Sequence, residues 1–404
     1  MGVNDLIRIA ARVNPRRRFL FVSTVLAKHL PVEPERALAA GRVLAMLNLK
    51  ADGHSIDVAD AALAEAIRHP AGARNLLREP PFHAPQVEDV VVIGLAETAT
   101  ALGHSVADAY ANATYIHTTR EDVGPGSISF LEEHSHAQEH RLYLSAADLP
   151  PNTQTAIVVD DELSTGTTLL NLIVALHNRR PFERYCFLSL LETLSEASRG
   201  RIAAVANELG VDITVRALLS APALRENIDT VLPQTSRLAE VAAGCRSSPS
   251  VLSFESSVPV SARGLISAQE RLALRHQAEI VASSVVRNPA RPAYVLGTGE
   301  FMYFPMLFAQ HLPGEVFVSS TTRTPIAVPG GNDYPIKRAC AWKHPDGALR
   351  FAYNLPPATD SDVYVIVESP WGMRDLDRLL CAMASSGLAS PTVVVVGTSS
   401  SSSE

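Results

Sequence analysis

Residues 157–168 of this 404-residue chain read IVVDDELSTGTT, and this stretch decides the fold. An apolar run of strand length delivers two adjacent carboxylates, Asp160 and Asp161, to its C-terminal end. A loop rich in Ser, Thr and Gly then leads into a helical pattern that begins at Leu169. Neighbouring acids accept strong hydrogen bonds from sugar hydroxyls, and a loop at a helix N-terminus suits a phosphate dianion. The stretch therefore predicts a site for a phosphorylated sugar.

Simpler interpretations of the separate parts stay open. An apolar strand that ends in acids before a helix is common in α/β proteins, and Ser164 or Thr165 alone would serve as a helix N-cap. Two other phosphate motifs are excluded. A nucleotide triphosphate loop requires a lysine after its second glycine, and none follows Gly166. A dinucleotide fingerprint requires three spaced glycines, which neither Gly94 nor the pair at 297 and 299 completes.

The combination of strand, paired acids and small-residue loop resembles the motif that binds phosphoribosyl pyrophosphate (PRPP) in type I phosphoribosyltransferases. Glu162 departs from the apolar residue that usually follows the second acid. The resemblance implies that Asp160 and Asp161 hold the ribose hydroxyls and act in catalysis. It also implies that five loop residues bind the 5′-phosphate, namely Ser164, Thr165, Gly166, Thr167 and Thr168. PRPP and a small-molecule acceptor are the implied partners, and Mg²⁺, held through substrate oxygens rather than by a protein cage, is the implied cofactor.

The composition is that of a globular protein of two or three domains. Hydrophobic residues make up 47% and charged residues 19% of the chain, which is ample apolar material for a core. A net charge of −7 argues against a nucleic-acid-binding face. No apolar run approaches the roughly 20 residues of a membrane span. The four cysteines are scattered and form no Cys-x-x-Cys pair, so we expect reduced packing residues in a cytoplasmic protein with no membrane partner.

The residue pattern changes along the chain and predicts its domains. Residues 1–85 read mainly as helices, which indicates a helical lead-in or hood of a phosphoribosyltransferase domain at 1–245. After this hood, short apolar strands alternate with helical patterns, as in an α/β fold with a parallel sheet flanked by helices. A Ser/Pro-rich stretch at 246–263 predicts a linker. We expect a second, smaller α/β domain at 264–397 and a disordered serine-rich tail at 398–404.

In the implied fold, the first strand-to-helix loop offers backbone N–H groups to pyrophosphate. Leu95, Ala96, Glu97 and Thr98 follow the first predicted strand and occupy this place. A plain turn with Thr98 as the helix N-cap is the alternative. Arg120 ends the next predicted strand and is a second candidate, because a guanidinium group binds pyrophosphate in a bidentate manner. A solvated surface arginine is the alternative there.

A polar segment at 127–144, rich in histidine, lies between the second and third predicted strands. In the family, a mobile loop that closes over the substrates occupies this position. The resemblance makes His134, His136 and Arg141 candidate donors to the leaving group, with the two histidines in a catalytic role. Zinc binding by the His-x-His pair is less favoured because no cysteine accompanies it, and a solvated polar loop is the remaining alternative.

Lys28 and His29 follow an apolar stretch near the N-terminus. In orotate-type members of the family, this region helps to form the pocket on the side of the base. The resemblance therefore makes both residues candidates for acceptor binding. Ordinary surface placement of the two basic side chains is the alternative.

The second half of the sequence echoes the first. The segment IGLAE at 93–97 is matched by LGTGE at 296–300, and YIHTTR at 115–120 is matched by VSSTTR at 318–323. A later apolar run at 363–369 falls where the strand with paired acids should lie, but it lacks both the paired acids and the phosphate loop. A chance similarity of two α/β segments is the alternative. A second candidate site follows from the echo, made of Gly297, Glu300, Thr321, Thr322, Arg323 and Glu368.

Four segments together give a closer resemblance, namely KHLPV at 28–32, GLAETA at 94–99, EHSHA at 133–137 and DDELSTG at 160–166. They look like the orotate phosphoribosyltransferase-like proteins of bacterial tellurite-resistance and stress-response gene clusters. The C-terminal domain of those proteins is named TRSP after a Thr-Arg-Ser-Pro motif, where this chain has Thr324 in place of Ser.

This closer resemblance implies an enzyme that transfers phosphoribose between PRPP and a base-like acceptor in nucleotide-like metabolism, with Mg²⁺ and with pyrophosphate released or taken up. A protein that senses PRPP without turning it over is the alternative function. Type I relatives are often dimers, so a homodimer is an expectation by analogy of fold.

Overall fold

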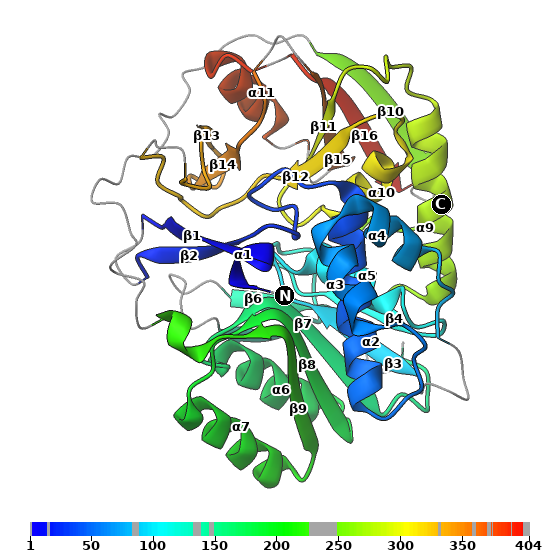
Figure 1. Cartoon of the computed structure of the whole chain (residues 1–404), viewed down its shortest axis with the longest axis vertical. Helices are drawn as coiled ribbons and strands as arrows, with labels where there is room; N and C mark the ends of the chain where they lie inside the picture. The colour runs from blue at the N-terminus through cyan, green and yellow to red at the C-terminus, as the bar shows by residue number, and fades with distance from the viewer. Residues whose placement is uncertain are drawn as a thin grey trace. The chain divides into compact units, whose positions relative to one another are not determined.

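The computed structural model describes residues 2–13, 17–82, 89–131, 139–144, 149–225, 249–329, 333–357, 361–369, 373, 375–388 and 390–398. The chain forms two compact units (Figure 1). The first unit comprises Met1–Leu6, Leu38–Asp229 and Ala262–Arg271, and the second comprises Ile7–Ala37, Thr230–Ser261 and Leu272–Glu404. Each unit therefore includes a segment from the other half of the chain.

A five-stranded parallel sheet organises the first unit. Its spatial order is β4 (Thr114–His117), β3 (Val90–Gly94), β7 (Thr155–Leu163), β8 (Arg184–Glu192) and β9 (Asp212–Ser220). Every neighbouring pair runs parallel. The apolar run of β3 is buried along its whole length, as expected of a parallel strand that is covered on both faces. The predicted α/β fold with a parallel sheet is thereby confirmed.

Helices cover both faces of this sheet. Figure 1 shows α5 (Thr100–Ala107) on one face and α6 (Thr167–Arg179) with α7 (Glu196–Leu209) on the other. Right-handed crossovers require this division, because the chain moves in opposite directions along the sheet after β3 and after β7. The core on the α6 side contains alternate strand residues and helix residues, among them Val91, Ile93, Ala156, Val158, Leu172 and Ile173.

The remaining elements of the first unit surround this sheet. They are α1 (Val3–Leu6), most of α2 (Pro34–Ala51), α3 (Asp60–Arg68), α4 (Pro70–Leu77), the hairpin of β5 (Ile128–Leu131) and β6 (Glu139–Leu142), and the 3-10 helix η2 (Pro222–Arg225). Helix α2 crosses α5 at Gly41, where an added Cβ would lie only 2.4 Å from the Cβ of Ser105. The hairpin supplies Phe130 and Leu142 to the core beneath α6.

A second five-stranded parallel sheet organises the second unit. Its spatial order is β10 (Ser250–Ser256), β16 (Thr392–Thr398), β15 (Asp362–Ser369), β11 (Ala293–Gly297) and β12 (Val316–Ser320). Every neighbouring pair is again parallel. The second α/β region that the sequence predicts is thus present.

Within the described part of the second unit, three helices and two hairpins accompany the sheet. The helices are α9 (Ala268–Ser283) from Leu272 onward, α10 (Tyr303–His311) and α11 (Leu376–Ser385). The hairpins pair β13 (Ala339–Lys343) with β14 (Leu349–Tyr353) and β1 (Ile7–Ala11) with β2 (Phe19–Ser23). Ala10 and Val22 of the β1–β2 hairpin share a core cluster with Phe351 and Tyr353.

Several boundaries differ from the sequence expectation. Residues 250–256 lie in the predicted linker but form β10, because their backbone pairs with the valine-rich strand β16. The predicted helical hood contains β1 and β2, and residues 7–37 group with the second unit. Thr398, the first residue of the predicted tail, ends β16, and residues 399–404 lie outside the described residues. The strand partners of β10 and of the end of β16 lie far away in sequence, whereas β1 and β2 pair with each other.

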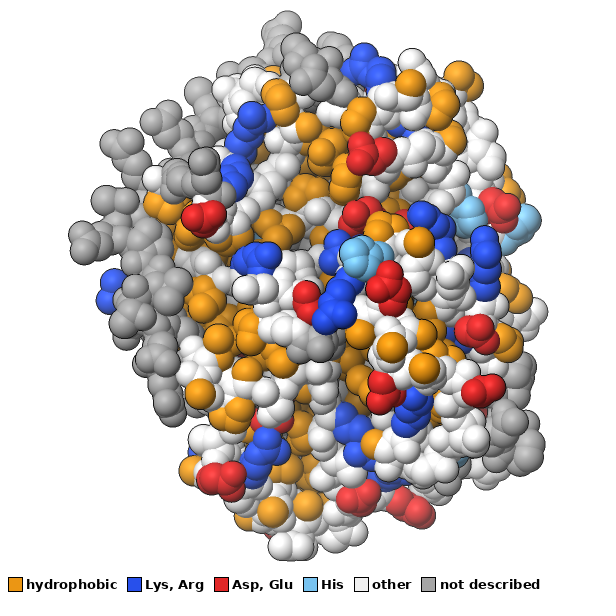
Figure 2. All heavy atoms as spheres, in the orientation of Figure 1, with side chains coloured by type: hydrophobic (Ala, Val, Ile, Leu, Met, Phe, Trp, Pro, Cys, Tyr) orange, Lys and Arg blue, Asp and Glu red, His pale blue; other side chains and the backbone are white. Residues whose placement is uncertain are grey.

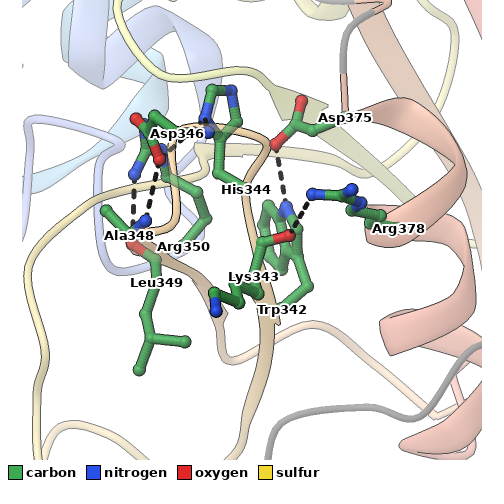
Figure 3. A network of polar contacts seen from close by, with 9 residues as sticks. All are labelled: Trp342, Lys343, His344, Asp346, Ala348, Leu349, Arg350, Asp375 and Arg378. Atoms are coloured by element: carbon green, nitrogen blue, oxygen red, sulfur yellow. Dashed lines mark hydrogen bonds and ion pairs between the residues drawn. The ribbon is translucent and has the colours of Figure 1, made fainter.

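A polar network closes the β13–β14 hairpin (Figure 3). The carboxylate of Asp346 accepts hydrogen bonds from the Ala348 amide at 2.8 Å and from Arg350 Nη2 at 2.6 Å, and it lies 3.0 Å from His344 Nδ1. Burial alone would raise the pKa of Asp346, but these donors outweigh it and lower the pKa from 3.8 to about 2. Nearby, Trp342 Nε1 donates to Asp375 at 2.8 Å and ties the hairpin to the start of α11.

We expect Asp346→Asn to destabilise the protein by about 1 kcal/mol at pH 7, which is below the roughly 1.5–3 kcal/mol of a buried hydrogen bond to a charged group because Asp346 is partly exposed to solvent. The folded pKa is depressed, so this contribution is present above pH ~4 and is lost as the pH falls towards 2. Urea unfolding followed by tryptophan fluorescence measures the difference. Asp333→Asn, at an exposed site, is the matched control. An equal loss in both variants would contradict the role of the network.

Candidate functional site

The two acids at the end of β7 leave the strand on opposite faces. Side chains alternate along a strand, so Asp160 lies on the face of Val158, which packs under α6, and Asp161 lies on the face of α5. Asp161 accepts a hydrogen bond from the Thr98 hydroxyl at 2.8 Å, and its own amide donates to Asp160 Oδ1 at 2.8 Å. Both carboxylates are half-buried. The pair is therefore oriented by the strand and by the loop before α5.

The loop after the acids wraps the N-terminus of α6. Gly166 is the residue before the helix and adopts a left-handed φ of 77°, which a residue with a side chain rarely takes. Neither Ser164 nor Thr165 caps the helix, so the simple N-cap interpretation is wrong. Thr165 Oγ1 instead accepts from the Thr167 amide at 3.3 Å, and the Thr165 carbonyl accepts from Arg201 Nη2 of α7 at 3.1 Å. The helix N-terminus thus faces the half-buried hydroxyls of 164–168.

The predicted pyrophosphate loop is only partly available to a ligand. The Leu95 amide donates to the Val159 carbonyl at 2.9 Å, and the Ala96 amide donates to Thr118 Oγ1 at 2.8 Å. Both N–H groups are used inside the protein, so Leu95 and Ala96 do not offer these amides to a ligand. A cis peptide bond joins Ala96 to Glu97. Thr98 does not cap α5, whose first residue is Thr100, so that alternative is wrong as well.

Gly94, which precedes this loop, serves packing rather than ligand approach. A Cβ at this position would lie 2.3 Å from the Tyr115 hydroxyl and 2.9 Å from the Ala99 carbonyl. The Tyr115 hydroxyl in turn donates to the Thr100 carbonyl at 2.5 Å. The glycine lets α5 start directly against β3, and this fixes the position of the loop.

Arg120 and Arg141 come from different elements at this end of the sheet. Thr119 and Arg141 exchange both backbone hydrogen bonds, at 2.8 and 2.9 Å, so β6 is joined to the segment that carries Arg120. Arg141 also lies 4.0 Å from Asp122. Both arginines are half-buried. The backbone pairing therefore joins the two segments that carry these arginines, which are 21 residues apart in sequence.

Three residues of this region were not singled out by the sequence. Thr118 is fully buried, and its hydroxyl oxygen lies 3.3 Å from His140 Nδ1. The same oxygen accepts the hydrogen bond from the Ala96 amide. Arg201 braces the phosphate loop from α7. The Thr-Thr-Arg echo is a signal for Thr118, and the histidine-rich segment is a signal for His140. No sequence signal points to Arg201.

The other sequence candidates lie elsewhere. His134 and His136 lie outside the described residues. Lys28 and His29 are buried in the second unit, where Lys28 Nζ donates to the Gly299 carbonyl at 2.6 Å. Surface placement is therefore wrong for these two residues, and the structure does not group them with Asp160. Their role in acceptor binding stays a prediction.

The residues of the second candidate site lie in one unit, at the carboxyl ends of three adjacent strands. Gly297 ends β11, Thr321 follows β12, and Glu368 lies near the end of β15. Glu368 accepts from the Ser261 hydroxyl at 2.6 Å. Glu300 and Thr322 are buried, and Arg323 is half-buried.

Charge is mixed over the surface. On the face that Figure 2 shows, Lys and Arg side chains alternate with Asp and Glu side chains and form no single extended field. Among the described residues, no group of three or more His, Cys, Asp or Glu side chains is placed to hold a metal ion. None of the described helices is both long and apolar enough to cross a lipid bilayer. Cys186, Cys340 and Cys381 are buried and free, and burial raises the pKa of the Cys186 thiol.

The solved structures that match this chain include three adenine phosphoribosyltransferases. The protein of Giardia lamblia is 18% identical with a TM-score of 0.30, and that of Thermoanaerobacter pseudethanolicus is 15% identical with a TM-score of 0.31. Both matches cover 54% of this chain and 98% of the other. The Leishmania donovani protein is 11% identical with a TM-score of 0.34, covering 58% of this chain and 83% of that one. No curated protein matches this chain.

Two family models match the sequence. The model described as "TRSP domain C terminus to PRTase_2" matches residues 261–383. The model described as "Phosphoribosyl transferase" matches residues 6–222, which is more than half of the chain and contains the paired acids, the glycine loop and both arginines. The chain therefore belongs to the phosphoribosyl transferase family and is a phosphoribosyltransferase with a C-terminal TRSP domain.

Proposed function

We propose that the chain binds PRPP at the end of β7 and transfers its phosphoribosyl group to a small base-like acceptor. One observation carries the proposal. Asp160 and Asp161 stand at the end of β7, and Gly166 begins the turn into α6 only five residues later. A pentose with free hydroxyls and a terminal phosphate fits this spacing, because the acids and the helix N-terminus recognise opposite ends of the same small molecule.

The chemistry requires little covalent participation by the protein. The bond from C1′ to pyrophosphate breaks, a bond from C1′ to the acceptor forms, and positive charge develops on the ribose ring between the two events. Asp160 and Asp161 stabilise that charge, and the Thr98 hydroxyl fixes the orientation of Asp161. Arg120, Arg141 and the amides of Glu97 and Thr98 neutralise the leaving pyrophosphate.

Mg²⁺ would neutralise the pyrophosphate oxygens when it is bound with PRPP. The donor set fits this ion, because Asp160 and Asp161 are hard oxygen ligands at half-exposed positions. Mg²⁺ commonly takes one or two carboxylates together with phosphate oxygens and waters.

The sequence resemblance to proteins of tellurite-resistance and stress-response gene clusters supports a role in nucleotide-like metabolism under stress. The acceptor is then a purine, a pyrimidine or a related heterocycle. Incubation of the protein with PRPP, Mg²⁺ and a panel of such bases, followed by assay of pyrophosphate release, tests the proposal. Release with at least one base is expected. Binding of PRPP without release for any base would favour a PRPP-sensing regulator instead.

We expect Asp160→Asn to lower kcat/KM for the accepted base by roughly 100-fold or more, because the charge that stabilises the transition state is removed at short range. The melting temperature should move by less than about 4 °C, since the side chain is half-buried and an amide has the same shape. Glu196→Gln, an exposed change in the first turn of α7, is the control and should leave kcat/KM unchanged. Wild-type turnover in Asp160→Asn would contradict the assignment.

Thr98 supplies a second test, which concerns the orientation of Asp161. Thr98→Val removes the hydroxyl at 2.8 Å from Asp161 without changing the shape, and a hydrogen bond to a charged group is worth roughly 1.5–3 kcal/mol. We expect kcat/KM to fall by roughly 10-fold or more, in line with that energy. Thr98→Ser keeps the hydroxyl and should restore most of the activity. Equal activity of the Val and Ser variants would show that the bond has no role in turnover.

A further inference from the structure

The second unit repeats the sheet of the first. Read from the same edge, the orders are β4-β3-β7-β8-β9 and β12-β11-β15-β16-β10, and all strands are parallel in both. Along the chain, α5 follows β3 and α10 follows β11, so a helix follows the second strand of both orders. The antiparallel pair β5–β6 lies between β4 and β7, and the pair β13–β14 lies between β12 and β15. Only the fifth strand differs in origin, because β9 follows its neighbour in sequence and β10 precedes the other four. The echo in the sequence therefore reflects a repeated fold.

The repeat extends to individual hydrogen bonds at the carboxyl edge. In the first unit, the Thr118 amide donates to the carbonyl that ends β3 at 2.9 Å, and Thr118 Oγ1 accepts from the Ala96 amide at 2.8 Å. In the second unit, the Thr321 amide donates to the carbonyl that ends β11 at 3.0 Å, and Thr321 Oγ1 accepts from the Gly299 amide at 2.8 Å. The loop that precedes each helix is thus held in the same way.

The turn that carries the arginine is also built twice. Thr119 Oγ1 accepts from the Glu121 amide at 3.0 Å, and Thr322 Oγ1 accepts from the Thr324 amide at 3.1 Å. Each threonine also exchanges two backbone bonds with the second strand of its hairpin, β6 or β14. Arg120 and Arg323 therefore occupy the same backbone setting in their units.

The acids differ in a way that separates the two sites. In the first unit, Gly94 pairs with Val159, which lies two residues before Asp161. The same count along the register of β11 with β15 shows that Glu368 is the residue of the second unit that corresponds to Asp161. The residue that corresponds to Asp160 is Val367, which is fully buried. The second unit therefore keeps the acid on the side of the pyrophosphate loop and lacks the acid on the opposite face.

Lys28 places a cation beside the matching turn of the second unit. Lys28 is 1% exposed, its ammonium group donates to the Gly299 carbonyl at 2.6 Å, and Ser320 Oγ donates to the same carbonyl at 3.2 Å. Gly299 has a left-handed φ of 57°, and no described atom lies within 4 Å of the position that its Cβ would take. A buried positive charge thus lies beside a backbone turn that opens onto free space.

We propose that the second unit binds pyrophosphate, or the pyrophosphoryl end of a small metabolite, at the carboxyl ends of β11 and β12. The ligand class rests on the proposed function of the matching loop in the first unit. Arg323 and Lys28 supply the positive charge, and the space over Gly299 admits the phosphate oxygens. Glu300 and Glu368 face the same edge, so the anion enters with Mg²⁺. Val367 leaves no acid for a ribose ring, so this site binds without transferring phosphoribose.

Calorimetric titration of the full chain with pyrophosphate and Mg²⁺ tests the proposal. Two equivalents are expected in the wild type. The matched variants are Arg323→Ala and Arg120→Ala, because the two side chains have the same backbone setting. Each should weaken one of the two binding events by roughly 10- to 100-fold, the effect of losing hydrogen bonds to a charged group. Arg323→Lys keeps the charge without the fork and should weaken the same event less.

The outcomes separate the two sites. A titration of Arg323→Ala that matches the wild type, with the variant folded by circular dichroism, would overturn the second site. If the wild type binds only one equivalent and only Arg120→Ala loses it, the second site is also overturned, whereas the proposed transfer site is supported. One equivalent that is lost only in Arg323→Ala would support the second site and count against the pyrophosphate assignment in the first. If Arg323→Ala does not fold, the Arg323→Lys titration decides in its place. Titrations with phosphate and with nucleoside diphosphates distinguish the free anion from a larger ligand.

Discussion

The parallel pairing of β3 with β7 is the constraint on which the transfer site depends. The register sets Gly94 beside Val159, and the Leu95 amide continues the ladder one step further by donating to the Val159 carbonyl. This bond fixes the start of the loop before α5 at the same level as the acids. Thr98 then lies within 2.8 Å of Asp161, although 63 residues separate them. With a net charge of −7, the chain would hold the proposed polyanionic substrate by local backbone geometry instead of by an overall positive field.

One strand position distinguishes the two units at the carboxyl edges of their sheets. In the first unit it is Asp160, which extends the buried row of Ala156 and Val158 to the edge of the sheet. In the second unit it is Val367, which joins the core cluster that contains Leu376 and Leu379 of α11. A carboxylate in that apolar cluster would pay a large desolvation cost, so the position serves either as core or as site. The second unit therefore keeps the edge at which we propose anion binding and has no acid at the position that corresponds to Asp160.

The sequence predicts those features that depend on local pattern. The parallel sheet flanked by helices agrees with the structure, as does the position of the acids near the end of a buried strand that leads into a helix. What the sequence misses is decided by distant partners. Strand β10 needs β16, which lies more than a hundred residues away, and the N–H groups of Leu95 and Ala96 are used by Val159 and Thr118. No window of neighbouring residues contains that information, which is why the Ser/Pro-rich segment suggests a linker.

One of the two edge strands of each sheet is bridged by a segment from the other half of the chain. Val32 bridges antiparallel to Val318 of β12, and Ile266 bridges antiparallel to Tyr115 of β4. Val32 lies two residues before α2, and Ile266 lies two residues before α9. Their partners Val318 and Tyr115 lie three residues before Thr321 and Thr118, the threonines that hold the loops before α10 and α5. An uncovered edge strand is a template for aggregation. Cutting the chain between 222 and 261, the limits of the two family matches, would leave β4 without Ile266 and β12 without Val32. The division that the linear order suggests is therefore not a division into independently folding halves, because each sheet needs a segment that the other half carries.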